Sequence, residues 1–300
     1  MQKPPFSNLI FSFALLALGF PLHTRAQSFT VGLIADCQYC NCDYSERWNN
    51  NYQQGLPRLQ EAVDTFNTQN VDFAVHLGDF IDRDYASFDA VLPIFNSLKM
   101  PQYHVLGNHD FSVADSLKTS VPQRLNLTQS YYSISKNDWV FIVLDGTDIS
   151  LYRTDDSTYL SQSETTRLNY LNNGRTQALP WNGAVGNQQL SWLETQLKQA
   201  ESNHQKVVVL CHFPVLPGGD ANLWNDLEIV QLLEKHTEVK AFINGHHHPG
   251  NYVTKNNIHY LTLQGMVRST EQNAFAIITV FENKIVVKGF GREPNRILIF

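Results

Sequence analysis

The stretch Phe29-Thr30-Val31-Gly32-Leu33-Ile34-Ala35-Asp36-Cys37-Gln38 decides the fold. Its first seven residues are mostly apolar, and this pattern predicts a buried β-strand. Asp36 and Gln38 follow directly, so two side chains with oxygen atoms that can bind a metal stand at the carboxyl end of the strand. Four more polar motifs lie farther along the chain, and the fold prediction depends on where they fall relative to the strands.

The four further motifs also contain residues that can bind metal ions. In chain order they are Gly78-Asp79-Phe80-Ile81-Asp82-Arg83, Gly107-Asn108-His109-Asp110, Cys211-His212 and Gly245-His246-His247-His248. Each follows a predicted strand, at residues 73–77, 102–106, 207–210 and 239–243. Ligands of open α/β sheets collect beyond the carboxyl ends of the strands. We therefore expect one sheet edge to collect Asp36, Asp79, Asn108, His212 and His246.

Apolar residues between these strands recur at helical spacing, which predicts helices that alternate with the strands. The first set is Leu56, Leu59, Val63 and Phe66, and similar sets lie near residues 88–95, 190–197 and 223–233. Beyond residue 250 the apolar runs follow one another without helices, which predicts antiparallel strands. Alternation followed by a run of strands is typical of an α/β sandwich with mixed sheets.

The first 26 residues are predicted to be a secretory signal peptide. Lys3 precedes an almost wholly apolar run over residues 9–22, and Thr24-Arg25-Ala26 places small residues at the cleavage positions. An uncleaved membrane anchor is the alternative, but the run is short for a membrane span. We therefore expect a secreted or periplasmic protein without stable membrane insertion. Residues 27–300 are predicted to form one domain, with a polar insertion or lid around residues 147–187.

Charge and cysteine content limit the partners of this protein. The 300 residues carry a formal net charge of −6 and no run of Lys or Arg, so a nucleic-acid partner has no electrostatic support. A small anionic substrate stays open, because bound metal ions reverse the local sign. Exported cysteines can pair, but Cys37 and Cys211, which stand next to predicted ligands, are predicted to be small buried residues at strand ends. The cysteines are Cys37, Cys40, Cys42 and Cys211.

The oxygen and nitrogen ligands in the motifs predict divalent metal ions. Carboxylates, amides and imidazoles together suit Mn²⁺, Fe or Zn²⁺ rather than an ion selected by thiolates. A carboxylate such as Asp79 can bridge two ions about 3.5–4 Å apart, and such a pair binds phosphate oxygens and lowers the pKa of a water. The motifs therefore predict a two-metal hydrolase of phosphate esters.

Three residues beside the ligands have predicted catalytic roles. His109 stands next to a ligand position and is predicted to donate a proton to the leaving oxygen. Asp110 is predicted to orient a ring or a loop, and Arg83 to bind a phosphate oxygen or to pair with Asp82. Asp82 is otherwise predicted to brace its loop, and His247 to point away from the ions.

The ordered motifs D-x-Q, G-D-x-x-D-R, G-N-H-D, H and G-H-x-H resemble those of the calcineurin-like metallophosphoesterase superfamily, over Val31 to about Val280. The resemblance implies a four-layer αββα sandwich of two mixed sheets, with a di-metal site at the strand ends. It also implies that His109 is the catalytic histidine. The implied ligands are Asp36, Gln38, Asp79 and His248 for one ion, and Asp79, Asn108, His212 and His246 for the other.

Gln38 is an informative departure, because most of the superfamily has D-x-H where this chain has D-x-Q. An amide oxygen is a harder and weaker ligand than imidazole, which favours Mn²⁺ over the alternatives Fe²⁺, Co²⁺ and Zn²⁺. The same glutamine occurs in the Mn²⁺-dependent ADP-ribose/CDP-alcohol diphosphatases, which the chain also resembles at residues 34–39, 103–109 and 143–145. This resemblance implies a nucleoside diphosphate conjugate as substrate, cleaved by metal-activated hydroxide.

Two other functions remain open on the same sequence. A broader phosphomonoesterase or a cyclic-nucleotide phosphodiesterase would use the same site. A non-catalytic scaffold would keep the fold, but no proposed ligand is missing. Tyr39, Tyr44 and Trp48 either stack on a nucleobase or anchor their loop.

Overall fold

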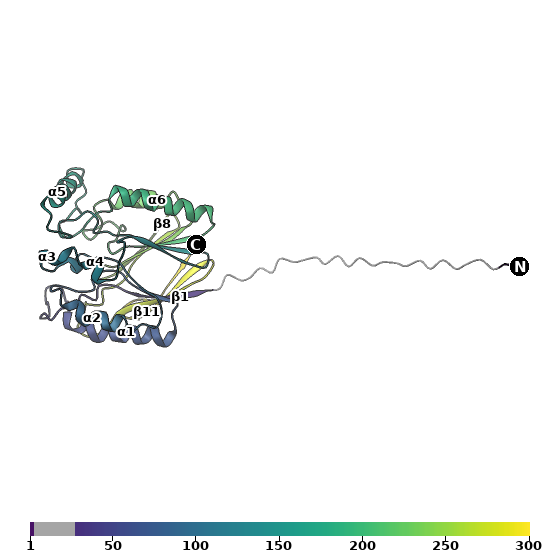
Figure 1. Ribbon diagram of the computed structural model, residues 1–300, viewed down its shortest axis with the longest axis horizontal. Coiled ribbons are helices and arrows are strands. Elements are labelled where there is room, and N and C mark those ends of the chain that lie inside the picture. Colours follow the sequence, from purple (N-terminus) through teal and green to yellow (C-terminus); the bar gives the residue numbers. More distant parts are fainter. Residues whose placement is uncertain (3–27) are drawn as a thin grey trace.

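The computed structural model describes residues 1–2 and 28–300, in which two sheets lie face to face between helices (Figure 1). The predicted signal peptide therefore lies outside the described residues, apart from Met1 and Gln2. In the described part of the chain, no helix combines the length and the apolarity that crossing a membrane requires.

The first sheet has six strands in the order β12-β11-β10-β1-β2-β3. Strands β1, β2 and β3 run parallel, so their carboxyl ends point to the same edge of the sheet. Strand β10 pairs antiparallel with β1 and begins the antiparallel part. The strands are β1 (Phe29–Ile34), β2 (Phe73–His76), β3 (Gln102–His104), β10 (Ala274–Val280), β11 (Lys284–Gly291) and β12 (Arg296–Ile299).

The second sheet also has six strands, in the order β4-β5-β6-β7-β9-β8. Its four central strands run parallel, and β4 and β8 are antiparallel edges. The carboxyl ends of β6 and β7 therefore point to one edge, as those of β1 to β3 do. The strands are β4 (Tyr132–Lys136), β5 (Trp139–Val143), β6 (Lys206–Leu210), β7 (Val239–Asn244), β8 (Asn251–Lys255) and β9 (Ile258–Thr262).

Four helices form the two outer layers. Helices α1 (Gly55–Gln69) and α2 (Ser87–Phe95) pack on the first sheet, and α6 (Asn187–Ser202) and α7 (Asp226–Leu233) pack on the second. Figure 1 shows α1 and α2 below the sheets and α6 above them. The predicted αββα sandwich of two mixed sheets is confirmed. The short helices α3 (Asp115–Lys118) and α4 (Val121–Arg124) follow β3.

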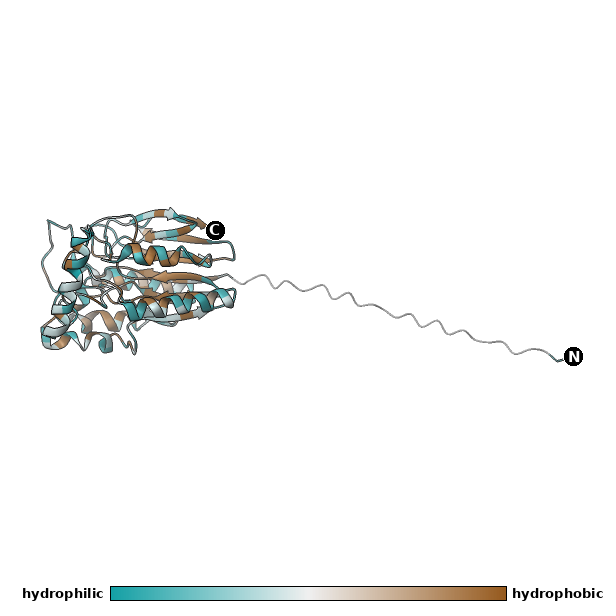
Figure 2. Ribbon diagram, turned by 90° about the horizontal axis from the view of Figure 1, so that it is seen from above, coloured by the Kyte–Doolittle hydropathy of each residue, from teal (hydrophilic) through white to brown (hydrophobic). Residues whose placement is uncertain are grey.

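Alternate residues of a strand face different cores, because side chains of a strand point to opposite faces. Val31 and Leu33 of β1 lie in the core between the two sheets, whereas Ile34 lies in the core under α1 and α2. Gly32 also faces α1, where a Cβ atom would lie 2.7 Å from the ring of Phe66. Both faces are buried, which explains why the strands are apolar throughout and not alternating. Figure 2 shows strands that are largely brown and helices that carry both teal and brown residues.

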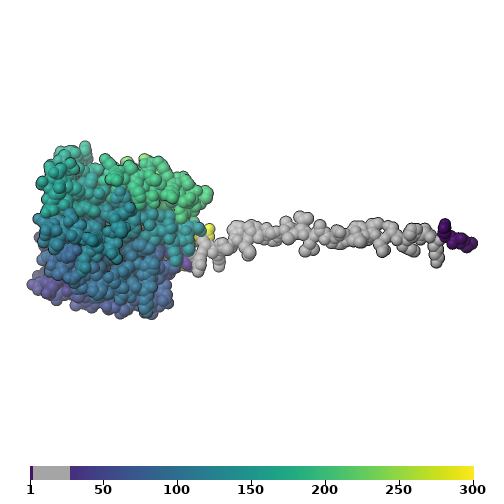
Figure 3. Space-filling view, in the orientation of Figure 1, coloured from purple at the N-terminus to yellow at the C-terminus, as the bar shows by residue number. Residues whose placement is uncertain are grey.

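The polar segment around residues 147–187 contains a helix that the sequence did not suggest, α5 (Ser157–Asn172). Its N-cap is Asp156, whose side chain accepts a hydrogen bond from the backbone of Tyr159. Tyr170 and Leu171 of α5 pack against a buried cluster of Ala178, Ala184 and Trp224. The segment is thus packed onto the second half of the chain, and Figure 3 shows it at the upper left of the molecular surface, beside the green residues of that half.

Candidate functional site

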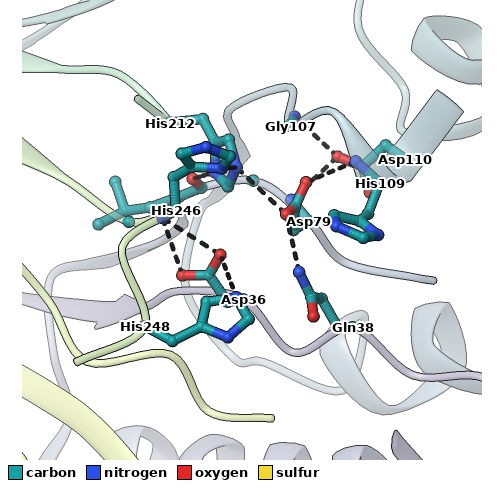
Figure 4. Close-up of polar contacts among 12 residues, drawn as sticks. Asp36, Gln38, Asp79, Gly107, His109, Asp110, His212, His246 and His248 are labelled. Carbon is teal, nitrogen blue, oxygen red and sulfur yellow. Dashed lines mark hydrogen bonds and ion pairs between the residues drawn. The ribbon is translucent and has the colours of Figure 1, made fainter. Parts of the chain in front are cut away.

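The predicted motif residues meet at one edge of the sandwich, where both sheets contribute loops (Figure 4). The loops after β1, β2 and β3 bring residues from the first sheet, and the loops after β6 and β7 bring histidines from the second. Within the first sheet, the backbone N–H of Gln38 donates to the carbonyl of Asp79 at 2.9 Å. Within the second, the N–H of Gly245 donates to the carbonyl of His212 at 3.0 Å. These backbone bonds fix neighbouring loops relative to each other.

Asp79 lies at the centre of the site. Its Oδ2 atom lies 3.2 Å from Nε2 of His212 and accepts from Nε2 of Gln38 at 2.9 Å. Its Oδ1 atom accepts from the backbone N–H of His109 at 2.8 Å. Asp79, His212 and His246 each place one candidate ligand atom within 4.8 Å of the others. A metal ion bound here would therefore find a carboxylate and two imidazoles already gathered.

Each of the two central histidines turns one ring nitrogen to this space and the other to an outer acceptor. Nδ1 of His212 lies 2.8 Å from the carbonyl of Leu77 and donates to it, so Nε2 faces the interior of the site. Nε2 of His246 lies 2.9 Å from Oδ1 of Asn182 and donates to it, so Nδ1 faces the interior. The two inner nitrogens are 3.2 Å apart. Two facing lone pairs would repel each other at this distance, so a proton or a metal ion has to lie at one of these nitrogens.

Asp36 connects the first sheet to the second. Its carboxylate accepts from the backbone N–H of His246 at 3.1 and 3.2 Å. Nε2 of His248 lies 3.5 Å from Oδ1 of the same carboxylate. Nδ1 of His248 faces Oδ1 of Asn50 at 3.3 Å. Asp36 and His248 therefore stand together on the side of Asp79 that Gln38 also lines (Figure 4).

Two amide oxygens show that the site suits metal ions. Oε1 of Gln38 and Oδ1 of Asn108 are buried and have no hydrogen-bond partner within the described residues. A buried amide oxygen without a partner costs free energy, and a hard divalent cation would satisfy it. The gathered donors are oxygens and imidazole nitrogens, a set that suits Mn²⁺, Fe²⁺ or Zn²⁺. The residues present thus fit a divalent metal site.

Several ligand positions have left-handed backbone conformations. The φ angles are 53° for Asp36, 43° for Gln38, 58° for Asp79 and 65° for His246. Such conformations cost about 1–3 kcal/mol each outside glycine and persist where the surrounding structure holds them. Their concentration at the strand ends supports a functional role for this edge of the sandwich.

The charges of the site are strongly coupled. Burial opposes ionisation of Asp79, but His212 and His109 outweigh it and hold the pKa of Asp79 well below its usual range. Burial likewise opposes protonation of His212, but the charge of Asp79 and its hydrogen bond raise the pKa of His212 to about 9. Burial and the proximity of His212 lower the pKa of His246. A metal ion would take over the place of the proton on His212.

His109 lies beside this cluster with its ring partly open to solvent. Nδ1 of His109 lies 2.8 Å from Oδ1 of Asp82, and the two side chains are 35% and 4% exposed. Burial opposes protonation, but the charge of Asp79 and the hydrogen bond to Asp82 raise the pKa of His109 to about 9. Within residues 28–300 the ring of His109 bonds through Nδ1, which leaves Nε2 to meet a substrate. We predicted that Asp82 only stabilises its own loop by hydrogen bonds. Its carboxylate also bonds to the ring of His109 on a neighbouring loop.

Asp110 stands where it can take one of the two roles predicted for it. Its carboxylate is fully buried and accepts from the backbone N–H groups of Gly107 at 2.9 Å, Phe80 at 2.7 Å and Asp79 at 3.2 Å. These bonds join the loop after β2 to the loop after β3. Of the two roles expected for Asp110, the structure supports orienting a loop, and it places the carboxylate out of reach of a substrate.

Arg83 and His247 stand at the margin of the site. Arg83 is exposed, and its guanidinium lies 5.7 Å from the centre of the Tyr52 ring. The partner expected for it, Asp82, bonds to His109 instead. The N–H of His247 donates to the carbonyl of Gly245, within the turn that carries its two neighbours.

The cysteines near the site are buried or bonded to each other, whereas two of the three aromatic residues in the neighbouring loop are exposed. Cys40 and Cys42 form a disulfide. Cys37 and Cys211 are buried and free, as the small buried residues that we favoured. Tyr39 packs against the core under α1 and α2, whereas Tyr44 and Trp48 are exposed. Tyr39 therefore anchors its loop, and stacking on a nucleobase stays open for the two exposed rings.

Sequence reasoning missed two residues that touch the site. Asn182 lies in the segment around residues 147–187, and Asn50 lies in the loop that leads to α1. Neither belongs to a motif. Asn50 is the middle residue of the run Asn49-Asn50-Asn51, and Asn182 lies between Trp181 and Gly183. Both side chains are buried, but no local pattern in the sequence distinguishes them from the other asparagines.

The chain is similar to proteins with related chemistry. A family model described as calcineurin-like phosphoesterase matches residues 29–250. The chain is 28% identical to the manganese-dependent ADP-ribose/CDP-alcohol diphosphatase of Mus musculus, covering 93% of this chain and 95% of that protein. It is 28% identical to the protein of the same name in Arabidopsis thaliana, covering 90% and 97%. A solved dimetal phosphatase from Danio rerio superimposes with a TM-score of 0.83 at 26% identity, covering 91% of this chain and 99% of that one.

Proposed function

Because the chain belongs to the calcineurin-like phosphoesterase family and is a metal-dependent phosphoester hydrolase, we propose that it cleaves the diphosphate of ADP-ribose or of CDP-alcohol nucleotides. The names of the mouse and Arabidopsis relatives support this substrate class. The observation that carries the proposal is Gln38, whose buried Oε1 has no hydrogen-bond partner within residues 28–300. An amide ligand at this position favours Mn²⁺, the ion in the names of these relatives.

We propose that the site holds two divalent ions, with Asp79 shared between them. This assignment is supported by the central position of Asp79 and by the two unpartnered amide oxygens in the described part of the chain. When bound, the ions supply positive charge to phosphate oxygens and lower the pKa of a nearby water. The ligands would be Asp36, Gln38, Asp79 and His248 for one ion, and Asp79, Asn108, His212 and His246 for the other.

The residues of the chain then act on the leaving group. Hydrolysis adds a water oxygen to one phosphorus of the diphosphate and breaks the bond from that phosphorus to the bridging oxygen. His109 is placed to give a proton from Nε2 to that oxygen, because Nδ1 is held by Asp82. Arg83 is an exposed cation on the loop that also carries Asp82, and this position suits a contact with a phosphate oxygen.

A substrate panel tests the proposal. ADP-ribose, CDP-choline, cyclic AMP and p-nitrophenyl phosphate would be compared with Mn²⁺, and then with Fe²⁺, Co²⁺ and Zn²⁺. We expect the two diphosphates to give the highest kcat/KM, with Mn²⁺ the best ion. Preference for p-nitrophenyl phosphate or cyclic AMP would favour a broader phosphomonoesterase or a cyclic-nucleotide phosphodiesterase. No turnover with any ion would leave the non-catalytic scaffold.

We also propose that the protein is exported after cleavage behind Ala26. The apolar run at residues 9–22 supports this proposal, as does the Cys40–Cys42 disulfide, because disulfides persist in oxidising compartments. N-terminal sequencing of the protein from the medium or periplasm of an expressing cell should begin at Gln27. A mature protein that retains Met1 in the cytoplasmic fraction would contradict export.

A further inference from the structure

Two asparagines outside the motifs hold the outer nitrogens of two motif histidines. Oδ1 of Asn182 lies 2.9 Å from Nε2 of His246. Oδ1 of Asn50 lies 3.3 Å from Nδ1 of His248. The two asparagines come from segments 132 positions apart in the chain (182 − 50), and each segment lies outside the strands that carry the motifs.

Asn182 is built rigidly into its position. Its side chain is fully buried, and Nδ2 donates to the carbonyl of Gln177 at 2.9 Å and to that of Asp220 at 2.6 Å. With both amide hydrogens used in this way, the amide orientation is determined and Oδ1 must point toward His246. The next residue, Gly183, accepts from the backbone N–H of Trp224 at 2.9 Å. The segment around residues 147–187 therefore holds one amide oxygen against the outer nitrogen of a histidine of the candidate metal site.

Asn50 is held by its backbone. Its N–H donates to the carbonyl of Ser45 at 3.2 Å, and the N–H of Ser45 donates back at 2.9 Å. The next residue, Asn51, donates to the carbonyl of Val267 at 2.8 Å. Asn50 itself is 5% exposed. Its amide oxygen therefore faces His248 from a closed turn.

The two contacts select opposite ring nitrogens. His246 gives its Nε2–H to Asn182, so Nδ1 faces His212 and the interior of the site. His248 gives its Nδ1–H to Asn50, so Nε2 faces Asp36. An acceptor on the outer nitrogen of a metal-binding histidine fixes its tautomer and its ring orientation, and losing it costs about 10–100-fold in metal affinity.

We propose that Asn182 and Asn50 are positioning residues that each serve a different ion of the pair. Asn182 orients His246 for the ion shared with His212 and Asn108, and Asn50 orients His248 for the ion shared with Asp36 and Gln38. This inference rests on the proposed two-metal site. According to this proposal, the segment around residues 147–187 increases the affinity for a metal ion, in addition to any contact that it makes with the substrate.

The decisive measurement is stepwise binding of Mn²⁺ to metal-free protein by isothermal titration calorimetry. The parent should bind two ions in separable steps. Asn182→Ala should weaken one step by about 10–100-fold, and Asn50→Ala should weaken the other by less, because its contact is longer. Asn173→Ala serves as a matched control, because Asn173 is an exposed asparagine at the end of α5 in the same segment as Asn182. The control should leave both steps unchanged.

A conservative variant separates positioning from structural support. Asn182→Asp keeps an oxygen acceptor for His246 but loses both donors to Gln177 and Asp220. A purely structural role predicts that Asn182→Asp harms Mn²⁺ binding at least as much as Asn182→Ala. Positioning predicts that Asn182→Asp retains most of the Mn²⁺ affinity, although the melting temperature of the metal-free protein falls in both variants. Asn50→Asp should likewise retain affinity that Asn50→Ala loses.

The metal-free parent offers a test that needs no variant. Long-range ¹H–¹⁵N spectra report which ring nitrogen carries the proton in each histidine. We expect Nε2–H for His246 and Nδ1–H for His248 at a pH where both rings are neutral. The opposite tautomers, or variants that weaken both steps equally, would overturn the inference. A parent that binds only one Mn²⁺ ion would instead overturn the two-ion proposal on which the inference rests.

Discussion

Nδ1 of His109 lies 2.8 Å from Oδ1 of Asp82, so a nearly buried carboxylate holds a histidine whose ring is partly open to solvent. Both residues come from loops of the first sheet, which Asp110 joins through backbone N–H groups. The pair therefore has a fixed geometry, and Nε2 points away from Asp82. The contribution of His109 and that of Asp82 can therefore be tested by separate substitutions.

Replacing His109 by alanine should lower kcat by about 10²–10⁴-fold, the usual contribution of a general acid. The content of Mn²⁺ should stay near that of the parent, because the ring bonds to Asp82 and not to the metal-binding cluster. Steady-state kinetics with ADP-ribose and elemental analysis of the same samples give the two values. If the variant loses its metal, His109 is a ligand and its role as an acid is wrong.

Asp82→Asn should shift the basic limb of the pH–rate profile to lower pH. Burial opposes protonation of His109, but the charges of Asp79 and Asp82 and the hydrogen bond to Asp82 raise its pKa in the metal-free protein, so the ring keeps its proton to a higher pH and loses it as the pH rises through that pKa. Removing the carboxylate of Asp82 removes part of the upward shift. The measurement is kcat/KM against pH. Asp84→Asn, a neighbouring exposed acid, is the control, and an unchanged basic limb in Asp82→Asn would contradict the contact.

Gln38→His should strengthen the binding of one ion and reduce the preference for Mn²⁺. An imidazole is a stronger and softer ligand than the amide oxygen, whose Oε1 has no other partner in the described residues. Activity with Mn²⁺, Co²⁺ and Zn²⁺ and retention of metal on dialysis measure the effect. The exposed Gln53→His controls for an added surface histidine. An identical metal response in Gln38→His and the parent would count against Gln38 as a ligand.

Gly107→Ala should damage both stability and metal binding. A Cβ atom at this position would lie 2.2 Å from Oδ1 and 2.3 Å from the backbone nitrogen of Asp79. The loop must move, at a cost of about 1–3 kcal/mol for overpacking, and the central carboxylate moves with it. Thermal unfolding and Mn²⁺ titration measure the two effects. At Gly219 an added Cβ meets no described atom within 4 Å, so Gly219→Ala should change neither value.

Removing metal should lower the melting temperature of the parent. Ions that bind only the native state stabilise it by about 2.7 kcal/mol when their concentration is 100 times Kd. Thermal unfolding with and without EDTA, followed by addition of Mn²⁺, measures this contribution. Asp79→Asn should show little or no response to Mn²⁺, because it changes the central carboxylate. A response equal to that of the parent would place the ions elsewhere.

The sequence predicted the fold and the shared edge well, because both follow from local periodicity. Asp36 and Asp79 each follow a buried strand, and parallel strands bring their carboxyl ends to one edge. The contacts between side chains were harder to predict. The carboxylate of Asp110 turned inward to backbone N–H groups, which its neighbour His109 gave no reason to expect. The contact of Asn182 with His246 joins residues 64 positions apart and leaves no periodic trace in the chain.

The site is divided between the two sheets. Because of this division, the protein can be catalytically active only when both sheets have folded and packed together. The first half of the chain brings the carboxylates and amides, and the second half brings His212, His246 and His248. A chain in which only β1 to β3 and their loops were in place would present carboxylates and amides without these imidazoles. The second sheet alone would have imidazoles without the central carboxylate. Molecules in which only one half of the chain is folded therefore lack part of the candidate metal site, and hydrolysis requires both halves.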